Sequence, residues 1–433
     1  MSTSPTRLER DPLGTVEVPA DALWGVHTLR ATRNSGTAEG VVTLPDRPAL
    51  LRALVQVKIA AARANVEAGA LAPEIGEAIA TAGREVLQGR WHDQFPANLV
   101  QGGGGTGTNM NVNEVLANRA GELLGGARGA YDRVHPNDHV NRSQSTNDVY
   151  PTALQLATIA SGSEALVDFE HLAATFDERA AAHAGMERLG RTCMQDALPL
   201  TVETTHRTHA TALRRTASGF GRALDGLRAV PLGGTAIGSG AGTPPGYSDR
   251  VVALLAEETG IDLTPAPDRH DALANLDPVL SVAGALERVM LSMAQVAQDL
   301  RFLSSGPRGG IGEVALPPVQ MGSSMMPGKI NPVLPELVLQ TSFEVRAARH
   351  VVECATAAGE LELNVMEPVV AKHLLAAIAD SGRTLRLFAD ACVAGLEWIP
   401  ATTEAHLRGS LLDAVTSAAK SGWESTHPVG GRE

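Results

Sequence analysis

The chain has 433 residues, of which 44% are hydrophobic, 19% are charged and only 3% are aromatic. This length predicts two or three domains, and an apolar content carried mainly by Ala, Leu and Val favours helix packing over β-sandwich packing. The net charge of −12 argues against nucleic acid or an anionic membrane as the main partner, although local cations still allow an acidic substrate to bind.

The first forty residues are rich in Pro, Gly and charge, and we expect extended segments and turns there. They lack the apolar core of a secretory signal, and no apolar run reaches the roughly 18 residues that a membrane-spanning helix needs. The three cysteines, Cys193, Cys354 and Cys392, are widely spaced, which favours free thiols over a disulfide framework or a zinc site. We therefore expect a cytoplasmic protein without a membrane segment.

Helical periodicity begins at about residue 48 and continues to residue 87, where apolar residues recur at spacings of three and four. The Gly-rich sequence QGGGGTGT then precedes a second helical segment, NMNVNEVLANRAGELL. A polar loop, HPNDHVNRSQSTND, leads into a further helix whose start is marked by Pro151.

The clearest periodic segment covers residues 286–303, where apolar side chains step by three and four in the manner of a packed helix. These are Leu286, Val289, Met293, Val296, Leu300 and Leu303. Further helices are predicted over residues 334–358 and 369–396. Long helices separated by polar, Gly-rich loops predict a helical bundle whose loops carry the function.

The segment GSSMMPGKINPVLPE, residues 322–336, has the composition of a carboxylate-binding site that removes a proton. It places two hydroxyls, a cation and an amide on one loop: Ser323, Ser324, Lys329 and Asn331. Gly322 and Gly328 give this loop the freedom to close over a ligand.

Two more loops precede helix starts. In GGGGTGTNMNVNE the glycines at residues 102–105 let backbone amides approach a ligand, and Thr106 adds a hydroxyl where anions are favoured. A flexible connector with a capping Thr explains the same pattern. In RSQSTNDVYPT a cap needs one side chain, whereas Ser145, Thr146 and Asn147 supply three, which indicates a ligand with several acceptor oxygens. A cap alone remains the alternative there.

Two other segments are less specific. In GRTCMQDALPLT, Arg191 and Thr192 precede Cys193, and a small buried thiol is the commoner fate of a free cysteine. The Gly-rich residues 231–247 lack the strand-then-helix setting and the downstream acid of a dinucleotide fingerprint, so we reject NAD binding.

Taken together, these segments resemble the aspartase/fumarase superfamily, and most closely its aspartate ammonia-lyase branch. The match covers nearly the whole chain, with LGTVEVPADALWGVHTLRA, HPNDHVNRSQSTNDVYPTA, LRFLSSGPRGGIGE and the highly specific GSSMMPGKINP in the family's order. The resemblance implies a mainly α fold with three domains, expected at residues 1–144, 145–396 and 397–433. The last would be a shortened remnant of the family's C-terminal domain. It also implies a homotetramer with a twenty-helix core and active sites shared by three subunits.

Carried over position by position, the resemblance implies that Ser323, as an alkoxide, removes the proton next to the β-carboxylate of L-aspartate, which gives fumarate and ammonia. Hydroxyl groups would hold that carboxylate: Thr106, Ser145, Thr146 and Ser324. Donors preorganised around an enediolate lower the barrier of such a step most. No cofactor and no metal is expected.

The resemblance also assigns the rest of the substrate. Lys329 and Asn331 would bind the α-carboxylate, and Asn147 with Thr192 would bind the amine. The supporting residues would be Cys193, Glu336, Met326, Gly322 and Gly328. Gly107 stands where aspartases commonly have Ser, which is expected to enlarge the site.

Three features favour aspartase over fumarase: GVHTLRA at residues 25–31, STND in place of SSND, and NVMEP in place of NVMKP. Fumarases resemble GRTHxQD, with a histidine paired to the glutamate that matches Glu336, whereas this chain has Cys193. The alternatives are a lyase of the same mechanism on another substituted succinate, a fumarate hydratase, and a non-catalytic scaffold. The intact Ser323, Lys329 and Asn331 argue against the scaffold.

Overall fold

The computed structural model describes residues 5–36 and 40–422, and 60% of it is helical, which confirms the predicted fold class. The strands of the described residues form short pairs. Three pairs are antiparallel: β1 (Thr6–Asp11) with β2 (Gly14–Pro19), β3 (Glu187–Thr192) with β4 (Gln195–Thr201), and β7 (Val314–Ala315) with β8 (Glu397–Trp398). The pair β5 (Ala229–Val230) and β6 (Thr264–Pro265) is parallel.

Contacts within the chain divide it into two compact units, each built from three segments. Unit 1 consists of Met1–Ser163, Phe220–Ala285 and Val345–Ala379, and unit 2 of Glu164–Gly219, Leu286–Glu344 and Asp380–Glu433. The chain passes between them inside five long helices: α5 (Thr146–Ala182), α6 (Val202–Asp225), α9 (Asp277–Leu303), α10 (Val333–Thr356) and α11 (Glu367–Phe388). The domain boundaries expected at residues 144 and 396 stay predictions, and residues 423–433 of the expected remnant lie outside the described residues.

Unit 1 contains shorter helices in addition to parts of the long ones. These are α1 (Val26–Ser35), α2 (Pro48–Glu67), α3 (Pro73–Leu87), α4 (Thr106–Leu123), α7 (Tyr247–Thr259) and α8 (Arg269–Ala274), with single turns at Leu44–Asp46, His92–Gln94 and Pro136–Val140. The periodic stretch predicted over residues 48–87 is therefore two helices, because the chain turns at Gly69, whose φ is +70°. A Cβ atom on Gly83 would lie 2.8 Å from Cγ1 of Ile59, so this glycine lets α3 pack closely on α2.

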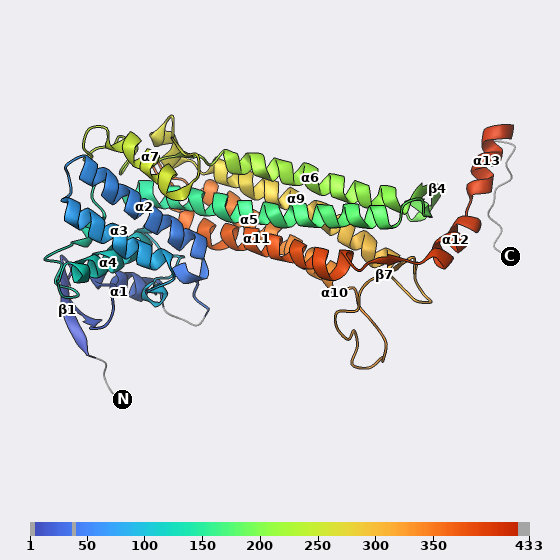
Figure 1. Cartoon of the computed structure of the whole chain (residues 1–433), viewed down its shortest axis with the longest axis horizontal. Coiled ribbons are helices and arrows are strands. Elements are labelled where there is room, and N and C mark those ends of the chain that lie inside the picture. The colour runs from blue at the N-terminus through green and yellow to red at the C-terminus, as the bar shows by residue number, and fades with distance from the viewer. Residues whose placement is uncertain (1–4, 37–39, 423–433) are drawn as a thin grey trace. The chain divides into compact units, whose positions relative to one another are not determined.

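Unit 2 contains the remaining parts of the long helices, which run side by side (Figure 1), together with α12 (Pro400–Arg408), α13 (Leu412–Ser421) and a π-helical turn at Ala389–Val393. The apolar stripe predicted on residues 286–303 is buried throughout, from Leu286 at 0% exposure to Leu303 at 8%. The stripe is therefore core, as its spacing predicts.

Helix α9 is also the one helix of the described residues that is long and apolar enough to cross a membrane, with a mean hydropathy of 1.3 over its most apolar window. The expectation that no segment reaches this length and apolarity is therefore wrong. Core helices of soluble proteins meet the same criterion, and 56% of this window is buried inside the structure.

Two buried histidines pack in the core of unit 2. His206 and His209 lie on α6, where their rings contact Phe176, and Nε1 of Trp398 donates a hydrogen bond of 3.0 Å to Nε2 of His206. Burial lowers the pKa of His206 to about 3 and that of His209 to about 4. Both rings are therefore neutral in the folded chain at pH 7.

Because burial keeps these two histidines neutral, we expect the free energy of unfolding to fall at acidic pH. An unfolded histidine titrates near pH 6.5, so between that pH and about 4 the unfolded chain binds more protons at position 209 than the folded chain does. Stability contributed by the neutral ring is present above pH 6.5 and is lost as the pH falls, by about 2 kcal/mol at pH 5.

The substitution His209→Leu tests this, because it removes the titrating group from an apolar site. Urea unfolding followed by circular dichroism at pH 7 and pH 5 should show a smaller loss of stability in the variant than in the wild type. His270→Gln removes an exposed histidine and should leave the pH dependence unchanged. Equal pH dependence in all three proteins contradicts the prediction.

Candidate active site

The residues predicted for the site fall into two groups, one in each unit. Unit 1 holds four of them: Thr106, Ser145, Thr146 and Asn147. Unit 2 holds the others: Thr192, Cys193, Gly322, Ser323, Ser324, Met326, Gly328, Lys329, Asn331 and Glu336.

The start of α5 presents two hydroxyl groups in a defined orientation. Oγ of Ser145 accepts a hydrogen bond from the backbone N–H of Asn147 at 3.2 Å, and Oγ1 of Thr146 accepts one from Nδ2 of Asn109 at 3.2 Å. Each oxygen already accepts an N–H, so each hydroxyl proton remains available for an acceptor oxygen of a ligand. Ser145 thus caps the helix as the alternative interpretation requires, while Thr146 is a donor beyond the cap.

Asn147 offers a hydrogen-bond acceptor to a ligand, whereas Ser145 and Thr146 offer donors. Its Nδ2 donates to the carbonyl oxygen of Ala236 at 2.8 Å, which leaves Oδ1 to accept. An amide oxygen suits the protonated amine that the sequence assigns to this position.

A buried carboxylate holds this turn in place. Asp148 is fully buried and accepts hydrogen bonds from the backbone N–H groups of Ser145 at 2.9 Å and of Gly233 and Thr235 at 3.0 Å. Burial raises the pKa of Asp148 to about 6, against the effect of these donors. The carboxylate therefore ties the α5 start to the Gly-rich segment that follows β5.

A buried lysine that the sequence analysis did not select lies behind the same turn. Nζ of Lys58, on α2, donates to Oδ1 of Asn141 and Oε1 of Gln144, both at 3.0 Å. Asn141 Oδ1 also accepts from Asn109, the residue that orients Thr146. Burial lowers the pKa of Lys58 to about 7, and the charge of Asp148 opposes that shift. A lysine inside the mostly apolar sequence VQVKIAAA is the signal in the sequence that could have identified it.

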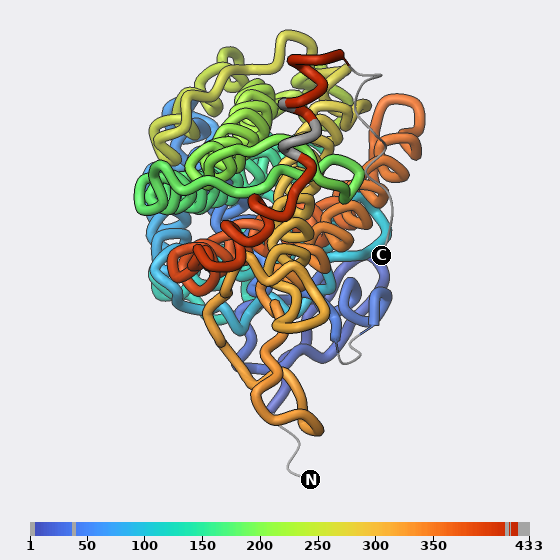
Figure 2. The backbone as a smooth tube through the Cα atoms, turned by 90° about the vertical axis from the view of Figure 1, so that its right-hand side faces the viewer, coloured from blue at the N-terminus to red at the C-terminus, as the bar shows by residue number. Residues whose placement is uncertain are grey.

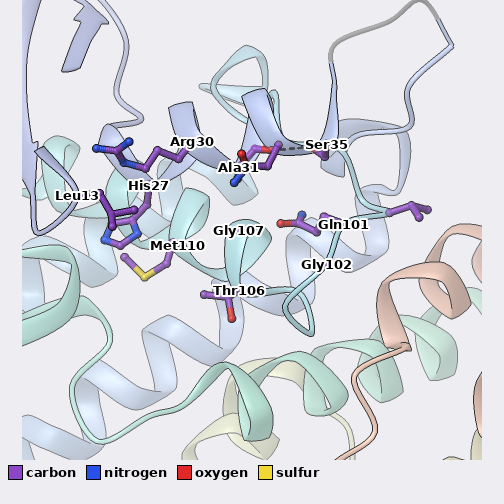
Figure 3. Close-up of a pocket in the computed structure, with 12 residues that line it drawn as sticks. Leu13, His27, Arg30, Ala31, Ser35, Gln101, Gly102, Thr106, Gly107 and Met110 are labelled. Carbon is purple, nitrogen blue, oxygen red and sulfur yellow. Dashed lines mark hydrogen bonds between the residues drawn. The ribbon is translucent and has the colours of Figure 1, made fainter. Parts of the chain in front are cut away.

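Thr106 lies at the first position of α4 and lines a cavity of about 660 Å³, together with His27, Arg30 and Gln101 (Figure 3). Its hydroxyl donates to the carbonyl oxygen of Gly103 at 2.8 Å. Arg30 is paired with Asp11 through two hydrogen bonds of 2.7 Å, which neutralises its charge. Thr106 was predicted from the sequence, whereas His27, Arg30 and Gln101, which also line the cavity, were not.

Gly107 does not enlarge this cavity, contrary to the expectation from sequence. A Cβ atom at position 107 would collide with Oε1 of Gln101, whose side chain fills that space. Nε2 of Gln101 is held by the carbonyl oxygen of Asn98 at 2.7 Å and by Oγ1 of Thr108 at 2.8 Å. The glycine makes room for an ordered amide rather than for a ligand.

In unit 2 the loop that carries Ser323 extends away from the helices (Figure 2). Oγ of Ser323 accepts hydrogen bonds from the backbone N–H groups of Met325 at 3.1 Å and Met326 at 3.0 Å. Two N–H dipoles aimed at one oxygen favour negative charge on it. This arrangement fits a serine that acts as a base.

The neck of this loop is closed by two hydrogen bonds. The backbone N–H of Gly322 donates to the carbonyl oxygen of Lys329 at 3.0 Å, and Nδ2 of Asn331 donates to the carbonyl oxygen of Gly322 at 2.8 Å. A Cβ atom on Gly322 would collide with the backbone of both partners, so the neck requires a glycine. Gly328, at φ +84°, supplies the turn that directly precedes Lys329.

A cavity of about 1360 Å³ lies beside this loop and is lined by Met326, Lys329, Asn331 and Glu336. Two further cations line it: Arg301 and Arg308. Nη2 of Arg301 lies 3.6 Å from Oε1 of Glu336, so this carboxylate has a cationic partner within its own unit. Neither arginine was predicted from the sequence.

Thr192 and Cys193 lie at the tip of the β3–β4 hairpin, where Cys193 and Met194 have φ of 53° and 62°. Cys193 is exposed, so its interpretation as a small buried thiol is wrong: the turn points it outward.

A buried carboxylate holds that hairpin close to its tip, through the residue before Thr192. Glu313 accepts two hydrogen bonds from Arg191, at 2.6 and 3.2 Å, and one of 2.7 Å from Nδ1 of His406. Burial tends to raise the pKa of Glu313, but these donors hold it below its usual range.

Comparisons with known proteins place these features in a family. A family model described as Lyase matches residues 14–347. The class II fumarate hydratase of Thermosynechococcus vestitus is 41% identical over 411 residues, which cover 95% of this chain and 87% of that protein. The aspartate ammonia-lyase of Escherichia coli K12 is 41% identical over 406 residues, which cover 94% and 84%. Because the chain is equally identical to the two enzymes, the comparison does not distinguish ammonia from water as the group that is eliminated.

A solved structure is also similar to this chain over nearly its whole length. The fumarate lyase:delta crystallin from Brucella melitensis, bound to cobalt, superimposes with a TM-score of 0.94 at 38% identity and covers 98% of this chain and 91% of that chain. The similarity therefore extends over the whole fold, including the segments that carry both groups of predicted site residues.

The neck of the Ser323 loop predicts a specific effect of Gly322→Ala. The added methyl group must break the two hydrogen bonds of the neck, each worth about 1 kcal/mol, so we expect trypsin to cleave after Lys329 at least about tenfold faster. The unfolding temperature should change little, because the loop adds little to the core.

Gly309→Ala is the matched control, since its Cβ would meet open space in the same connecting segment. Cleavage at equal rates in the two variants, followed by mass spectrometry of the products, contradicts the role given to the neck.

Proposed function

Since this chain belongs to the aspartase/fumarase superfamily of lyases, we propose that it catalyses the reversible elimination of ammonia from L-aspartate to give fumarate. The observation that carries the proposal is Ser323, whose Oγ accepts two backbone N–H groups on a glycine-hinged loop. No metal and no cofactor takes part in the proposed steps.

In this proposal Ser323, as an alkoxide, takes a proton from the substrate carbon next to the β-carboxylate. The electron pair of the broken C–H bond moves into that carboxylate, which becomes an enediolate with an additional negative charge. Hydroxyl protons of Ser145 and Thr146, left available by the hydrogen bonds their oxygens accept, then stabilise the new charge. The pair returns to form the carbon–carbon double bond as the C–N bond breaks.

The remaining residues of the proposed site offer donors to the two carboxylates and acceptors to the ammonium group. Thr106 and Ser324 would add donors to the β-carboxylate, and Lys329 with Asn331 would bind the α-carboxylate. Oδ1 of Asn147 and the hydroxyl of Thr192 would accept from the ammonium group.

Position 193 and Glu336 support an amine rather than a hydroxyl leaving group. An amine leaves already protonated and needs less acid help than hydroxide does. Cys193 is exposed at the hairpin tip, and Glu336 has Arg301 as its partner rather than a histidine. The hydratase reaction is the second candidate, because a fumarate hydratase is as similar to the chain as an ammonia-lyase is.

We also propose a cytoplasmic homotetramer with active sites completed by neighbouring subunits. Large apolar side chains exposed on the helices of unit 2 support an interface there: Leu291, Phe302, Phe343 and Leu387 are each more than two-fifths exposed. The three cysteines are free thiols, as a reducing compartment favours.

The substrate is tested by following the ultraviolet absorbance of the fumarate double bond with L-aspartate, L-malate and substituted aspartates. Product from L-aspartate alone supports the ammonia-lyase, and product from L-malate alone supports the hydratase. Product from no substrate contradicts an active lyase.

Ser323→Ala should lower kcat by about 10²–10⁴-fold, the usual contribution of a positioned base, with a smaller change in KM. Ser324→Ala should instead raise KM more than it lowers kcat. The control is Ser281→Ala, which changes an exposed serine on α9. Near wild-type turnover by Ser323→Ala, in a protein of unchanged oligomeric state, rules out Ser323 as the base.

A further inference from the structure

A buried carboxyl group without a cationic partner lies at the first residue of α11. Glu367 is 2% exposed, and within the described part of the chain its Oε1 has no hydrogen-bond partner. Tyr150, on α5, is fully buried, and its hydroxyl likewise finds no partner among the described residues. The two groups interact electrostatically, since the charge of Glu367 raises the pKa of Tyr150 beyond the effect of burial. The proposed mechanism uses neither side chain.

Tyr150 lies under the loop at residues 102–106, which we call the glycine loop. A Cβ atom on Gly105 would collide with the ring of Tyr150, and one on Gly104 would lie 3.4 Å from Cγ1 of Val365, two residues before Glu367. The glycine loop therefore rests directly on Tyr150 and on the segment that leads into α11. Thr106, which ends the glycine loop, is the hydroxyl assigned to the substrate carboxylate.

Glu367 is therefore connected to Thr106 through Tyr150 and the glycine loop. Burial raises the pKa of Glu367 to about 8, so the carboxyl group is neutral at pH 7. Tyr150 is the ionisable group that interacts with it, while Lys58 on α2 and Asp148 on α5 interact with each other. As the pH rises through about 8, a negative charge appears beneath the glycine loop without a cation beside it.

We propose that Glu367 is a positioning residue that acts through Tyr150 on the glycine loop, and that its neutral carboxyl group allows a substrate with two carboxylates to bind at Thr106. When ionised, the same group repels that substrate. The inference rests on the dicarboxylate site of the proposed function, but it is independent of the leaving group. It gives the binding of a dicarboxylate at this site an alkaline limit.

The test is the binding of succinate, a dicarboxylate that carries no leaving group, measured by titration calorimetry from pH 6.5 to pH 9.5. Wild-type affinity should fall by on the order of tenfold more than the affinity of Glu367→Gln over this range, because the amide never ionises. At pH 6.5 the two proteins should bind succinate equally. Lys58 also loses charge between pH 6.5 and pH 9.5, but it does so in both proteins. The effect of Glu367 is therefore measured as the difference between the wild type and Glu367→Gln.

Glu362→Gln is the matched control, because it makes the same chemical change at an exposed position on the preceding turn, and it should follow the wild type. Unfolding temperatures supply a second readout: the raised pKa makes the wild type lose stability relative to Glu367→Gln as the pH rises from 4.5 to 8. If the amide variant does not fold, Glu367→Met, which is neutral and of similar length, takes its place with the same expected results.

Identical pH dependence of succinate binding in the wild type and the neutral variant overturns the inference. A variant that is merely less stable at every pH, with an unchanged binding profile, also overturns it, because that result describes packing alone. Failure of the proposed function is a separate outcome. If no substrate yields fumarate while Glu367→Gln still removes the alkaline loss of succinate binding, the inference stands and the proposed reaction does not.

Discussion

The buried polar network behind the start of α5 is the constraint on which the unit 1 part of the site depends. Asp148 collects three backbone N–H groups, and Lys58 fixes the amide oxygens of Asn141 and Gln144. Because Asn141 also accepts from Asn109, the orientation of Thr146 depends on Lys58, which is three hydrogen bonds away. Buried polar groups are costly when they are unpaired, and the paired groups of this network favour one arrangement of the turn and of the hydroxyl protons it presents, although Oδ1 of Asn109 has no partner among the described residues.

In unit 2, hydrogen bonds likewise fix the orientation of predicted site residues, but these residues lie on a loop rather than at a helix start. The two N–H groups aimed at Ser323 come from the next residues of its own loop, whose neck is closed by Gly322 and Asn331, so the chemistry of one side chain depends on the backbone of its neighbours. The hairpin of Thr192 is held through Arg191 by the buried Glu313. Preorganised donors cost no reorganisation when charge develops, which is the physical advantage of placing such groups on fixed backbone.

Much of this could be predicted from the sequence, and the errors have physical causes. The helical class and the packed stripe from Leu286 to Leu303 follow from periodicity, which is a local property. Cys193 was expected inside because cysteine is usually buried, but a turn with positive φ points it outward. Gly107 was expected to leave space, but Gln101, six residues earlier, fills it. These outcomes depend on contacts and turns that residue type does not encode.

By itself, the sequence determined the fold class, the superfamily and the loops that carry hydroxyl, amide and cationic side chains, because periodicity and residue order are written along the chain. Only the tertiary structure decided which of these groups are donors and which are acceptors, through the partners that occupy Ser145, Thr146 and Asn147. It also decided the charge state of Lys58 and Glu367, since burial and distance to other charges exist only after folding.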